Sequence, residues 1–229
     1  VVRSPKKLQF LLTNRGISSE TISTHLTIYH GSITDFFAVQ STLQNCNTII
    51  LSIDGAPQFL PNPLRPTLDQ PEICHIAITT ILTVLTNLIT SSGATYNPRV
   101  LVALSSTGTS HVRDVPLLLR PLYAWLLPVA HADKREMERE IDMVPDGVLR
   151  GWVVVMPALL TDGGEPGEVK VRAGWEMKRA EEVGGRWGGV EGVAVGYTVS
   201  REDVGAWVFK EVVEREERGW WEKKVRLAY

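Results

Sequence analysis

Four short segments of the chain carry side chains that could bind a ligand or take part in chemistry. Residues 52–57 contain Gly55, which permits close approach of the backbone to a ligand. Residues 105–108 form a cluster of hydroxyl groups suited to polar contact with a ribose or a substrate. Residues 131–138 carry titratable side chains on a helix, and residues 157–163 form a further turn. Each segment alone is also ordinary turn chemistry, so their order along the chain carries more weight than any one of them.

The stretches between these groups alternate between strand-like and helix-like patterns. The strand-like runs at 48–52, 99–105 and 151–156 are apolar on both faces, which is typical of a parallel sheet covered by helices on both sides. In such a sheet, ligands bind at the carboxyl ends of the strands, so the loops after these strands are the expected site. Further strands are predicted at 26–30 and 225–228, and helices at 35–43, 72–90, 116–142 (in pieces) and 200–215.

The composition limits the classes of function. Of the 229 residues, 44% are hydrophobic and 22% charged, which suits one soluble domain over residues 1–229. The chain becomes more polar near residue 130, but a charged helix at 133–141 runs through that shift, so one domain is the simpler interpretation. The net charge of −2 argues against nucleic acid or anionic lipid as a partner. Two cysteines are too few for a disulfide framework and indicate a reducing, cytoplasmic compartment.

Two apolar stretches could be mistaken for membrane segments. Residues 73–89 also contain His75, Asn87 and four threonines, and residues 116–130 are interrupted by Arg120 and three prolines. A bilayer span needs about 20 mostly apolar residues. We therefore expect both stretches to be helices that face a protein core, and we expect no membrane partner.

The order of these segments resembles that of the atypical short-chain dehydrogenases/reductases, in particular the NmrA-like and biliverdin/flavin-reductase-like NAD(P)-binding proteins. The resemblance covers nearly the whole chain, although no single motif in it is decisive. It implies a Rossmann-like, doubly wound parallel sheet of the α/β class. The matching segments are residues 1–8, 31–35, 51–57, 104–108, 131–134, 156–163 and 200–204.

The resemblance implies NADP as the cofactor, with NAD less favoured. Arg3 and Ser4 match the end of the family's second strand, beside the adenosine ribose, where an arginine can pair with a 2′-phosphate. The alternative is a solvated arginine at a strand end. Ser32 replaces an aspartate that the family uses near the adenine amino group, and Asp35 is better explained as a helix N-cap. The other residues expected to bind the cofactor are Ser52, Gly55, Ala56, Ser105, Lys134, Pro157 and Leu160.

Lys134 matches the lysine that the family places against the hydroxyls of the nicotinamide ribose. The alternative is a surface lysine that pairs with Glu138 at the i,i+4 spacing. In conventional members, a tyrosine four residues before this lysine is the general acid, but position 130 is alanine here. Tyr123 lies eleven residues before Lys134, so helical spacing excludes it from that role.

His131 and Ser106 complete the expected catalytic residues. His131 lies three positions before Lys134 and could donate a proton, although a lone histidine near a helix start is more often structural. Because the usual dyad is absent, the resemblance favours hydride transfer to a readily reduced acceptor with little acid assistance from the protein. No metal site is expected.

One part of the family pattern is missing from the sequence. Such domains begin with a strand, a glycine-rich turn and a helix whose N-terminus holds the pyrophosphate. The chain contains no Gly-x-x-Gly-x-x-Gly, and the glycines at 184–189 follow no buried strand. We therefore expect the first strand, its loop and its helix to lie upstream of Val1. Because that strand is central in a doubly wound sheet, its absence predicts poor stability and weak dinucleotide binding.

Three functions from different classes remain open on the sequence alone. The first is an NADPH-dependent oxidoreductase acting on an unknown small-molecule substrate. The second is a non-catalytic NADP sensor that regulates a partner protein, which the missing tyrosine favours. The third is an inactive, truncated product. Turnover of NADPH with several acceptors would separate the first two.

Overall fold

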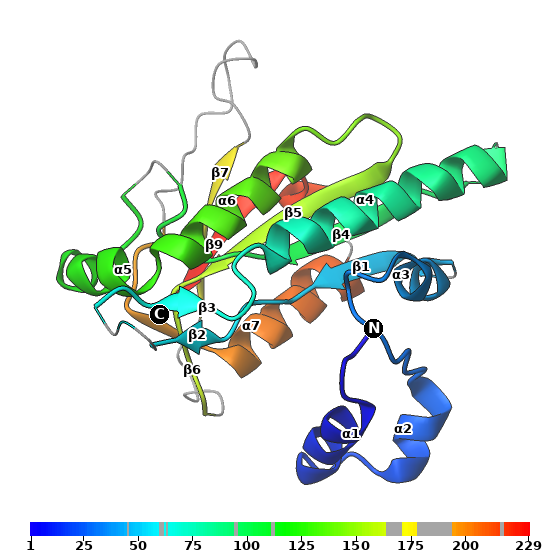
Figure 1. The fold of residues 1–229 in the computed structure, drawn as a ribbon, viewed down its shortest axis with the longest axis horizontal. Helices are drawn as coiled ribbons and strands as arrows, with labels where there is room; N and C mark the ends of the chain where they lie inside the picture. The colour runs from blue at the N-terminus through cyan, green and yellow to red at the C-terminus, as the bar shows by residue number, and fades with distance from the viewer. Residues whose placement is uncertain are drawn as a thin grey trace. The chain divides into compact units, whose positions relative to one another are not determined.

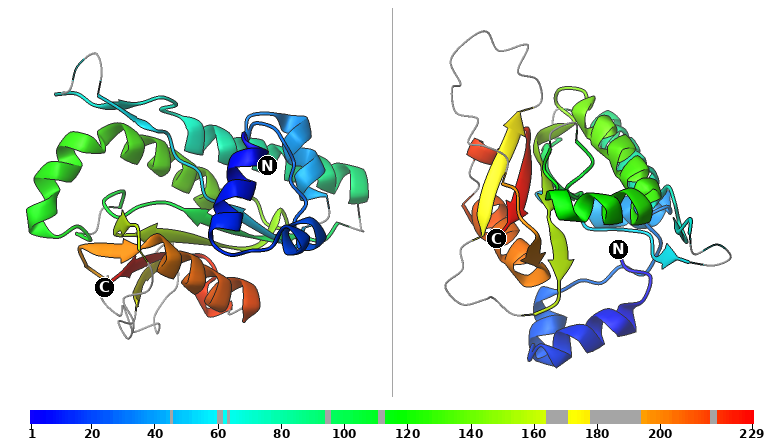
Figure 2. Two further views of the ribbon diagram at one scale, coloured as in Figure 1. Left: turned by 90° about the horizontal axis from the view of Figure 1, so that it is seen from below. Right: turned by 90° about the vertical axis from the view of Figure 1, so that its left-hand side faces the viewer.

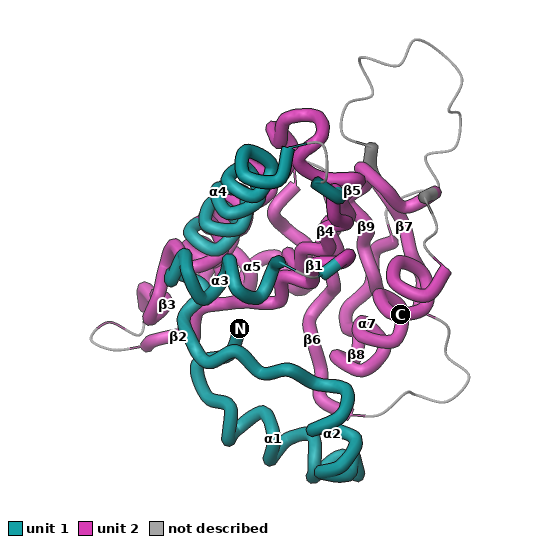
Figure 3. The backbone as a smooth tube through the Cα atoms, turned by 90° about the vertical axis from the view of Figure 1, so that its right-hand side faces the viewer, with its two compact units in different colours: residues 1–46, 76–97 teal, residues 47–75, 98–229 magenta. Residues whose placement is uncertain are grey.

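The computed structural model describes residues 1–44, 46–59, 62, 64–93, 96–110, 113–163, 171–177, 194–215 and 218–229. It divides the chain into two compact units, one of residues 1–46 and 76–97 and the other of residues 47–75 and 98–229 (Figure 3). The expectation of one domain over residues 1–229 stays a prediction.

The first unit is helical. It contains α1 (Pro5–Asn14), α2 (Ser19–His25), α3 (Phe36–Leu43) and most of α4 (Ile73–Ser92). Proline suits the first turn of α1 because its missing N–H has no partner in a helix there. The predicted helix at 35–43 is confirmed as α3, with Asp35 as its N-cap: the carboxylate accepts hydrogen bonds from the backbone N–H groups of Phe37 and Ala38.

The predicted strand at 26–30 is wrong. Only a single parallel bridge forms there, between Val2 and His30. The backbone N–H of Val2 donates to Tyr29 at 2.9 Å, and that of Gly31 donates to Val2 at 3.2 Å. A strand needs a partner along its length, and the neighbouring segment turns into helix α1 at Pro5, so the pairing stops after one bridge.

Helix α4 is the apolar stretch predicted over 72–90. Within the described residues, it is the helix long and apolar enough to cross a membrane by length and composition. Its side chains at Cys74, Ala77, Ile78, Val84 and Leu85 are nevertheless fully buried. A helix that buries one stripe of its surface this completely is typical of a protein core, as the sequence indicated.

The second unit is built on a five-stranded sheet in the order β1-β4-β5-β9-β7 (Figure 1). The parallel strands are β1 (Thr48–Leu51), β4 (Arg99–Leu104), β5 (Leu149–Pro157) and β9 (Lys223–Ala228). β7 (Arg172–Met177) pairs antiparallel with β9. The predicted α/β class with a mostly parallel sheet is thereby confirmed, and strands were predicted at the positions of all four parallel strands.

Helices cover both faces of this sheet (Figure 2). On one face lie α7 (Arg201–Trp207) and its π-helical continuation (Val208–Glu214). They pack on every second residue of the strands, so one core contains Val100, Val102, Val153, Val155, Val225 and Leu227 together with Val204, Val208 and Val212. On the other face lies α6 (Pro128–Asp142), which buries Met137 and Ile141. Each fully buried Val side chain stabilises the fold by roughly 1.5–3 kcal/mol.

The helical region predicted in pieces over 116–142 is confirmed. It consists of a 3₁₀ turn (Leu117–Leu119), α5 (Arg120–Leu126) and α6. Pro121 and Pro128 stand in the first turns of α5 and α6, where proline is tolerated, and so they set the breaks. Two short pairs complete the unit: β2 (Pro57–Gln58) with β3 (Thr67–Leu68), and β6 (Leu159–Thr161) with β8 (Thr198–Ser200).

Strand β1 pairs with β4 on one side only, as far as the described residues go. Within the described residues, β1 is therefore an edge strand of this sheet.

Candidate functional site

The loops after β1 and β4 and the end of β5 meet at one edge of the sheet. The three strands are parallel neighbours, with Leu51 opposite Ala103 and Leu104 opposite Val155. The backbone N–H of Thr107, in the loop after β4, donates to Pro157 at 3.2 Å. This edge holds half of the site residues predicted from the sequence: Ser52, Gly55, Ala56, Ser105, Ser106 and Pro157.

Lys134 connects two of these loops. Its ammonium Nζ lies 2.8 Å from Oδ2 of Asp54, after β1, and 3.5 Å from the carbonyl oxygen of Ser105, after β4. Lys134 is 7% exposed, whereas the Asp54 side chain is 51% exposed. A buried cation with a half-exposed carboxylate beside it offers a donor and an acceptor to a ligand arriving from solvent.

The structure does not contain the alternative expected from the sequence, a surface ion pair between Lys134 and Glu138. Glu138 is buried and accepts hydrogen bonds from the hydroxyls of Ser105 at 2.5 Å and Thr109 at 2.7 Å. Its other oxygen pairs with Lys224 of β9 at 3.1 Å. Glu138 therefore fixes the loop after β4 to helix α6 and to the sheet. The Ser105 hydroxyl donates its hydrogen bond to Glu138 rather than to a ligand.

Lys224 is held charged by its acidic neighbours. Burial alone would lower the pKa of Lys224, but Glu138 and Asp142 outweigh burial and raise that pKa above its usual value. The ammonium lies 3.1 Å from each carboxylate. The pair of carboxylates on α6 thus anchors the helix over β9.

Asp133 fixes the start of α4 to the same helix. Its two carboxylate oxygens accept hydrogen bonds from the backbone N–H groups of Cys74 and His75, both at 2.9 Å. A carboxylate at a helix N-terminus satisfies donors that have no partner inside the helix. Burial raises the pKa of the Cys74 thiol, so this cysteine is a packing residue rather than a nucleophile.

Asp54 is the functional candidate that sequence reasoning missed. The loop 52–57 was selected for Gly55 and its neighbours, but the carboxylate in it was not singled out. The available signal was its place directly after an apolar parallel strand, where ligand-binding side chains gather. Its ion pair with Lys134 depends on tertiary structure and cannot be read from spacing.

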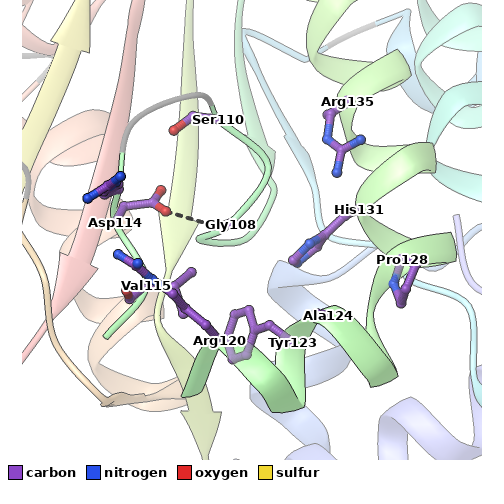
Figure 4. A pocket seen from close by; sticks show the side chains of 11 residues that line it. Gly108, Ser110, Asp114, Val115, Arg120, Tyr123, Ala124, Pro128, His131 and Arg135 are labelled. Atoms are coloured by element: carbon purple, nitrogen blue, oxygen red, sulfur yellow. Dashed lines mark hydrogen bonds between the residues drawn. The ribbon is translucent and has the colours of Figure 1, made fainter. Parts of the chain in front are cut away.

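A cavity of about 450 Å³ lies next to this edge, within the second unit (Figure 4). Its walls come from the loop after β4, from α5 and from the first two turns of α6. Such a volume is suited to a small organic molecule. The lining residues include Gly108, Asp114, Tyr123 and His131.

His131 projects from α6 into this cavity (Figure 4). Its side chain is buried, and its Nε2 has no hydrogen-bond partner among the described residues. Burial, helped by the cationic Arg135 and Lys134, lowers the pKa of His131 to about 4. At neutral pH the imidazole is therefore uncharged and can make one further hydrogen bond in the cavity.

Tyr123 lies beside His131, with ring centroids 5.8 Å apart. Burial raises the pKa of Tyr123, against the effect of a hydrogen bond with Thr107, so the phenol keeps its proton. At Gly108 the loop after β4 approaches helix α6 closely. The φ of Gly108 is +91°, and a Cβ there would stand 2.8 Å from Cε1 of His131. Helical spacing had excluded Tyr123 as a partner of Lys134, and the structure places it on a different helix, α5.

A buried ion pair supports the wall of the cavity. Nε of Arg226, in β9, donates to Oδ2 of Asp114 at 2.8 Å, and both side chains are essentially inaccessible. The other oxygen of Asp114 accepts from the backbone N–H of Gly108 at 3.0 Å. Arg226 also donates to the Ser110 hydroxyl at 2.6 Å. Gly108, Ser110 and Asp114 are thereby linked to Arg226 of the sheet.

The remaining predicted residues are placed as follows. Arg3 and Ser4 are exposed and precede α1 in the first unit. Ser32, also in that unit, bonds to the Thr34 hydroxyl at 2.8 Å, within its own turn. Leu160 lies in β6 of the second unit. The glycines at 184–189 lie outside the described residues. Within the described part of the chain, no group of three His, Cys, Asp or Glu side chains could hold a metal ion.

Two proteins of Aspergillus species match nearly the whole chain, although no protein-family model matches it. The chain is 41% identical to Reductase pytE of Aspergillus terreus over 227 residues, which cover 94% of this chain and 81% of that protein. It is 32% identical to Oxidase pynE of Aspergillus niger over 264 residues, which cover 100% of this chain and 88% of that protein.

Solved structures show the same fold. One is a short-chain dehydrogenase/reductase (wide type) from Veillonella parvula in complex with NADP, with a TM-score of 0.62 at 16% identity over 95% of this chain and 79% of that one. The chain belongs to the same family as Reductase pytE, and it has the fold of the short-chain dehydrogenases/reductases. Another is ChuY, an anaerobillin reductase from Escherichia coli O157:H7, with a TM-score of 0.55 at 13% identity over 96% of this chain and 88% of that one.

These comparisons confirm the Rossmann-like fold that the sequence predicts. The two relatives are named a reductase and an oxidase, and the Veillonella parvula protein binds NADP, so the comparisons support the predicted class of NAD(P)-dependent oxidoreductase with an unidentified substrate. The chain departs from conventional short-chain dehydrogenases/reductases at Ala130, on α6, where the general-acid tyrosine would stand. His131 and Tyr123 also have side chains that carry a hydrogen-bond donor, as that tyrosine would, and both line the cavity.

Proposed function

We propose that this protein is an NADP-dependent reductase of a small, readily reduced organic molecule. The observation that carries the proposal is the buried Lys134 ammonium, 2.8 Å from Asp54 at the carboxyl edge of β1 and β4. When bound, the reduced nicotinamide supplies a hydride. Lys134 and Asp54 would hold the hydroxyls of its ribose, because one provides donors and the other an acceptor.

The acceptor would occupy the cavity lined by Tyr123 and His131. Because the pKa of His131 is lowered to about 4, its imidazole is a hydrogen-bond donor rather than a strong acid at neutral pH. The proton that completes the reduction therefore comes from solvent. This restricts the acceptor to molecules that accept a hydride without protonation by an acidic side chain, such as quinones, flavins or activated double bonds.

The preference for NADP rests on Arg3. An exposed arginine can pair with the 2′-phosphate that distinguishes NADP from NAD. Ser4, Ser32, Ser52, Gly55, Ala56, Pro157 and Leu160 remain the other proposed contacts of the cofactor, and Ser106 a proposed contact of the substrate. The free cysteines, of which Cys74 is buried, support a reducing cytoplasmic location.

Oxidation of NADPH in the presence of quinone, flavin and carbonyl acceptors tests the proposal. We expect turnover with at least one quinone or flavin, and a loss of about 100-fold in kcat/KM for Lys134→Met, which removes the positioning of the cofactor. The matched control is Lys210→Met, which changes an exposed lysine of the π-helical segment.

Two results would contradict the reductase. NADPH binding without turnover of any acceptor would favour the non-catalytic sensor. Equal activity of Lys134→Met and Lys210→Met would remove Lys134 from the site. Because the sequence lacks a glycine-rich phosphate loop, we expect weak binding by the 229-residue chain, and titrations should extend to about 1 mM.

A further inference from the structure

The cavity beside His131 carries an unbalanced positive charge. Arg113, Arg120 and Arg135 all line it. Within the described parts of the chain, none of the three forms an ion pair with an acidic side chain. The acidic residue in the wall, Asp114, is already paired with Arg226 at 2.8 Å. Three guanidinium groups around one small cavity therefore lack a counter-charge.

His131 adds an unused hydrogen-bonding atom at the same place. Its Nε2 is buried without a partner among the described residues, and the side chain is 6% exposed. Buried polar atoms of this kind are rarely left unsatisfied in proteins, and a bound ligand is a common reason for an exception. In Figure 4 the ring points to the space between Gly108 and Tyr123, and Arg135 follows one turn later on the same helix.

Part of the cavity wall is apolar. Val115, Tyr123, Ala124 and Pro128 line it together with the arginines and Ser110. A ligand that matches both parts has an apolar or aromatic body and an anionic group at one end. Planar guanidinium groups bind carboxylates through paired hydrogen bonds, which fits this anion better than a neutral polar group.

We infer that the substrate of this protein is an organic acid whose carboxylate is bound in this cavity by Arg113, Arg120 and Arg135. The neutral His131 donates a further hydrogen bond to the same carboxylate. That this acid is the substrate rests on the function proposed above, whereas the binding of a carboxylate in the cavity does not. Lys134 and Asp54, the proposed contacts of the cofactor, do not line the cavity, so the anion is assigned to the substrate and not to a phosphate of the dinucleotide.

Titration with benzoate, and with benzamide as its neutral counterpart, tests the inference. The readout is the NMR signal of the His131 Cε1–H group in the full chain. We expect benzoate to shift this signal in a saturable manner and benzamide to leave it unchanged. Arg120→Gln and Arg135→Gln should each weaken benzoate at least about tenfold, because each removes a charged donor.

Arg139→Gln is the matched control. Arg139 is on the same helix as Arg135, is exposed, and pairs with Glu136 at 3.0 Å outside the cavity. Its loss should leave benzoate affinity unchanged. Equal binding of benzoate and benzamide, or equal affinity of the Arg135→Gln and Arg139→Gln variants, would overturn the inference.

A competition experiment separates substrate from cofactor. NADP⁺ should leave the benzoate titration unchanged, and displacement of benzoate by NADP⁺ would assign the arginines to the cofactor phosphate and overturn the inference. Failure of the proposed function looks different: benzoate would still bind with the same dependence on Arg120 and Arg135, but no acceptor would be reduced. Conversely, NADPH oxidation without benzoate binding would leave the reductase standing and refute the carboxylate site.

Discussion

The ammonium group of Lys134 lies 2.8 Å from Oδ2 of Asp54, which joins helix α6 to the loop after β1. The same nitrogen is 3.5 Å from the Ser105 carbonyl in the loop after β4. Helix α6 thus places one cation at the carboxyl ends of two neighbouring parallel strands, where Rossmann-like proteins bind ligands. The stability and the chemistry of the site should both depend on this pair.

Removal of the Asp54 charge should weaken the fold moderately. Asp54→Asn leaves the buried Lys134 ammonium without its counter-charge, but Asp54 is half-exposed, so solvent reduces the loss. We expect about 1–2 kcal/mol of destabilisation, below the 3–5 kcal/mol of a fully buried pair. Urea unfolding measures it.

A double-mutant cycle separates the pair from its surroundings. If the two side chains interact, Asp54→Asn combined with Lys134→Met should cost less than the sum of the single changes. Strict additivity would show that the pair contributes nothing to stability.

The buried pair of Asp114 and Arg226 should contribute much more to stability than the pair of Asp54 and Lys134. Both side chains are inaccessible, so Asp114→Asn removes the carboxylate that pairs with Arg226 in the core, and we expect a loss of about 3–5 kcal/mol. The contrasting variant is Asp162→Asn, which breaks the exposed pair with Arg201 and should cost about 0–1 kcal/mol. Similar losses in thermal unfolding for both variants would contradict the burial of the first pair.

Gly108 should tolerate no side chain. Gly108→Ala combines a left-handed backbone with a Cβ that would stand 2.8 Å from His131. Gly147→Ala is the matched control, because φ there is +85° and nothing lies within 4 Å of the added atom. We expect about 1–2 kcal/mol for the control from the backbone alone, and about 1–3 kcal/mol more for Gly108→Ala from overpacking. Equal losses would show that the loop is not packed on His131.

The fold should lose stability in mild acid through His131. The folded state holds the pKa of His131 near 4, below the value of about 6.5 in an unfolded chain. Between these two values the unfolded state binds a proton that the folded state does not, so stability falls as pH decreases from about 6.5 to 4. The loss should reach about 3 kcal/mol at the acid end.

His131→Gln should remove this part of the pH dependence. Urea unfolding of both proteins at pH 7 and pH 5 measures the difference. The prediction is contradicted if the variant loses as much stability as the parent protein over that interval.

The sheet could be predicted from the sequence because its signal is local. β1, β4 and β5 are short runs of mainly apolar residues, and parallel strands covered on both faces require such runs. The N-cap role of Asp35 was equally local, since a cap binds backbone groups two or three residues away. The predicted strand at 26–30 was wrong because strand formation depends on a distant partner.

The candidate site could be predicted only in part. Loop positions at the ends of parallel strands follow from topology, so Ser52, Gly55 and Ser105 were selected with Lys134 and His131. The contacts between these loops are long-range, however. Nothing in the spacing connects Asp54 with Lys134, or Asp114 with Arg226, because each pair meets only after the sheet and α6 have assembled.

The cavity could not be predicted from the sequence, because its walls are brought together only by the tertiary structure. Arg113, Arg120 and Arg135 come from a loop, from α5 and from α6, and each alone is an ordinary surface arginine in the sequence. Tyr123 was set aside because it lies eleven residues before Lys134, whereas the family's tyrosine lies four residues before the lysine. The break before Pro128 turns α5 and brings Tyr123 beside His131.

The most direct test of the account is a saturation-transfer NMR experiment with NADP⁺. If Lys134 and Asp54 hold the nicotinamide ribose, saturation should pass to the protons of that ribose in the parent chain and in Lys210→Met, and should be lost in Lys134→Met. Equal transfer to these protons in Lys134→Met would contradict the assignment of this edge of the sheet as the cofactor site.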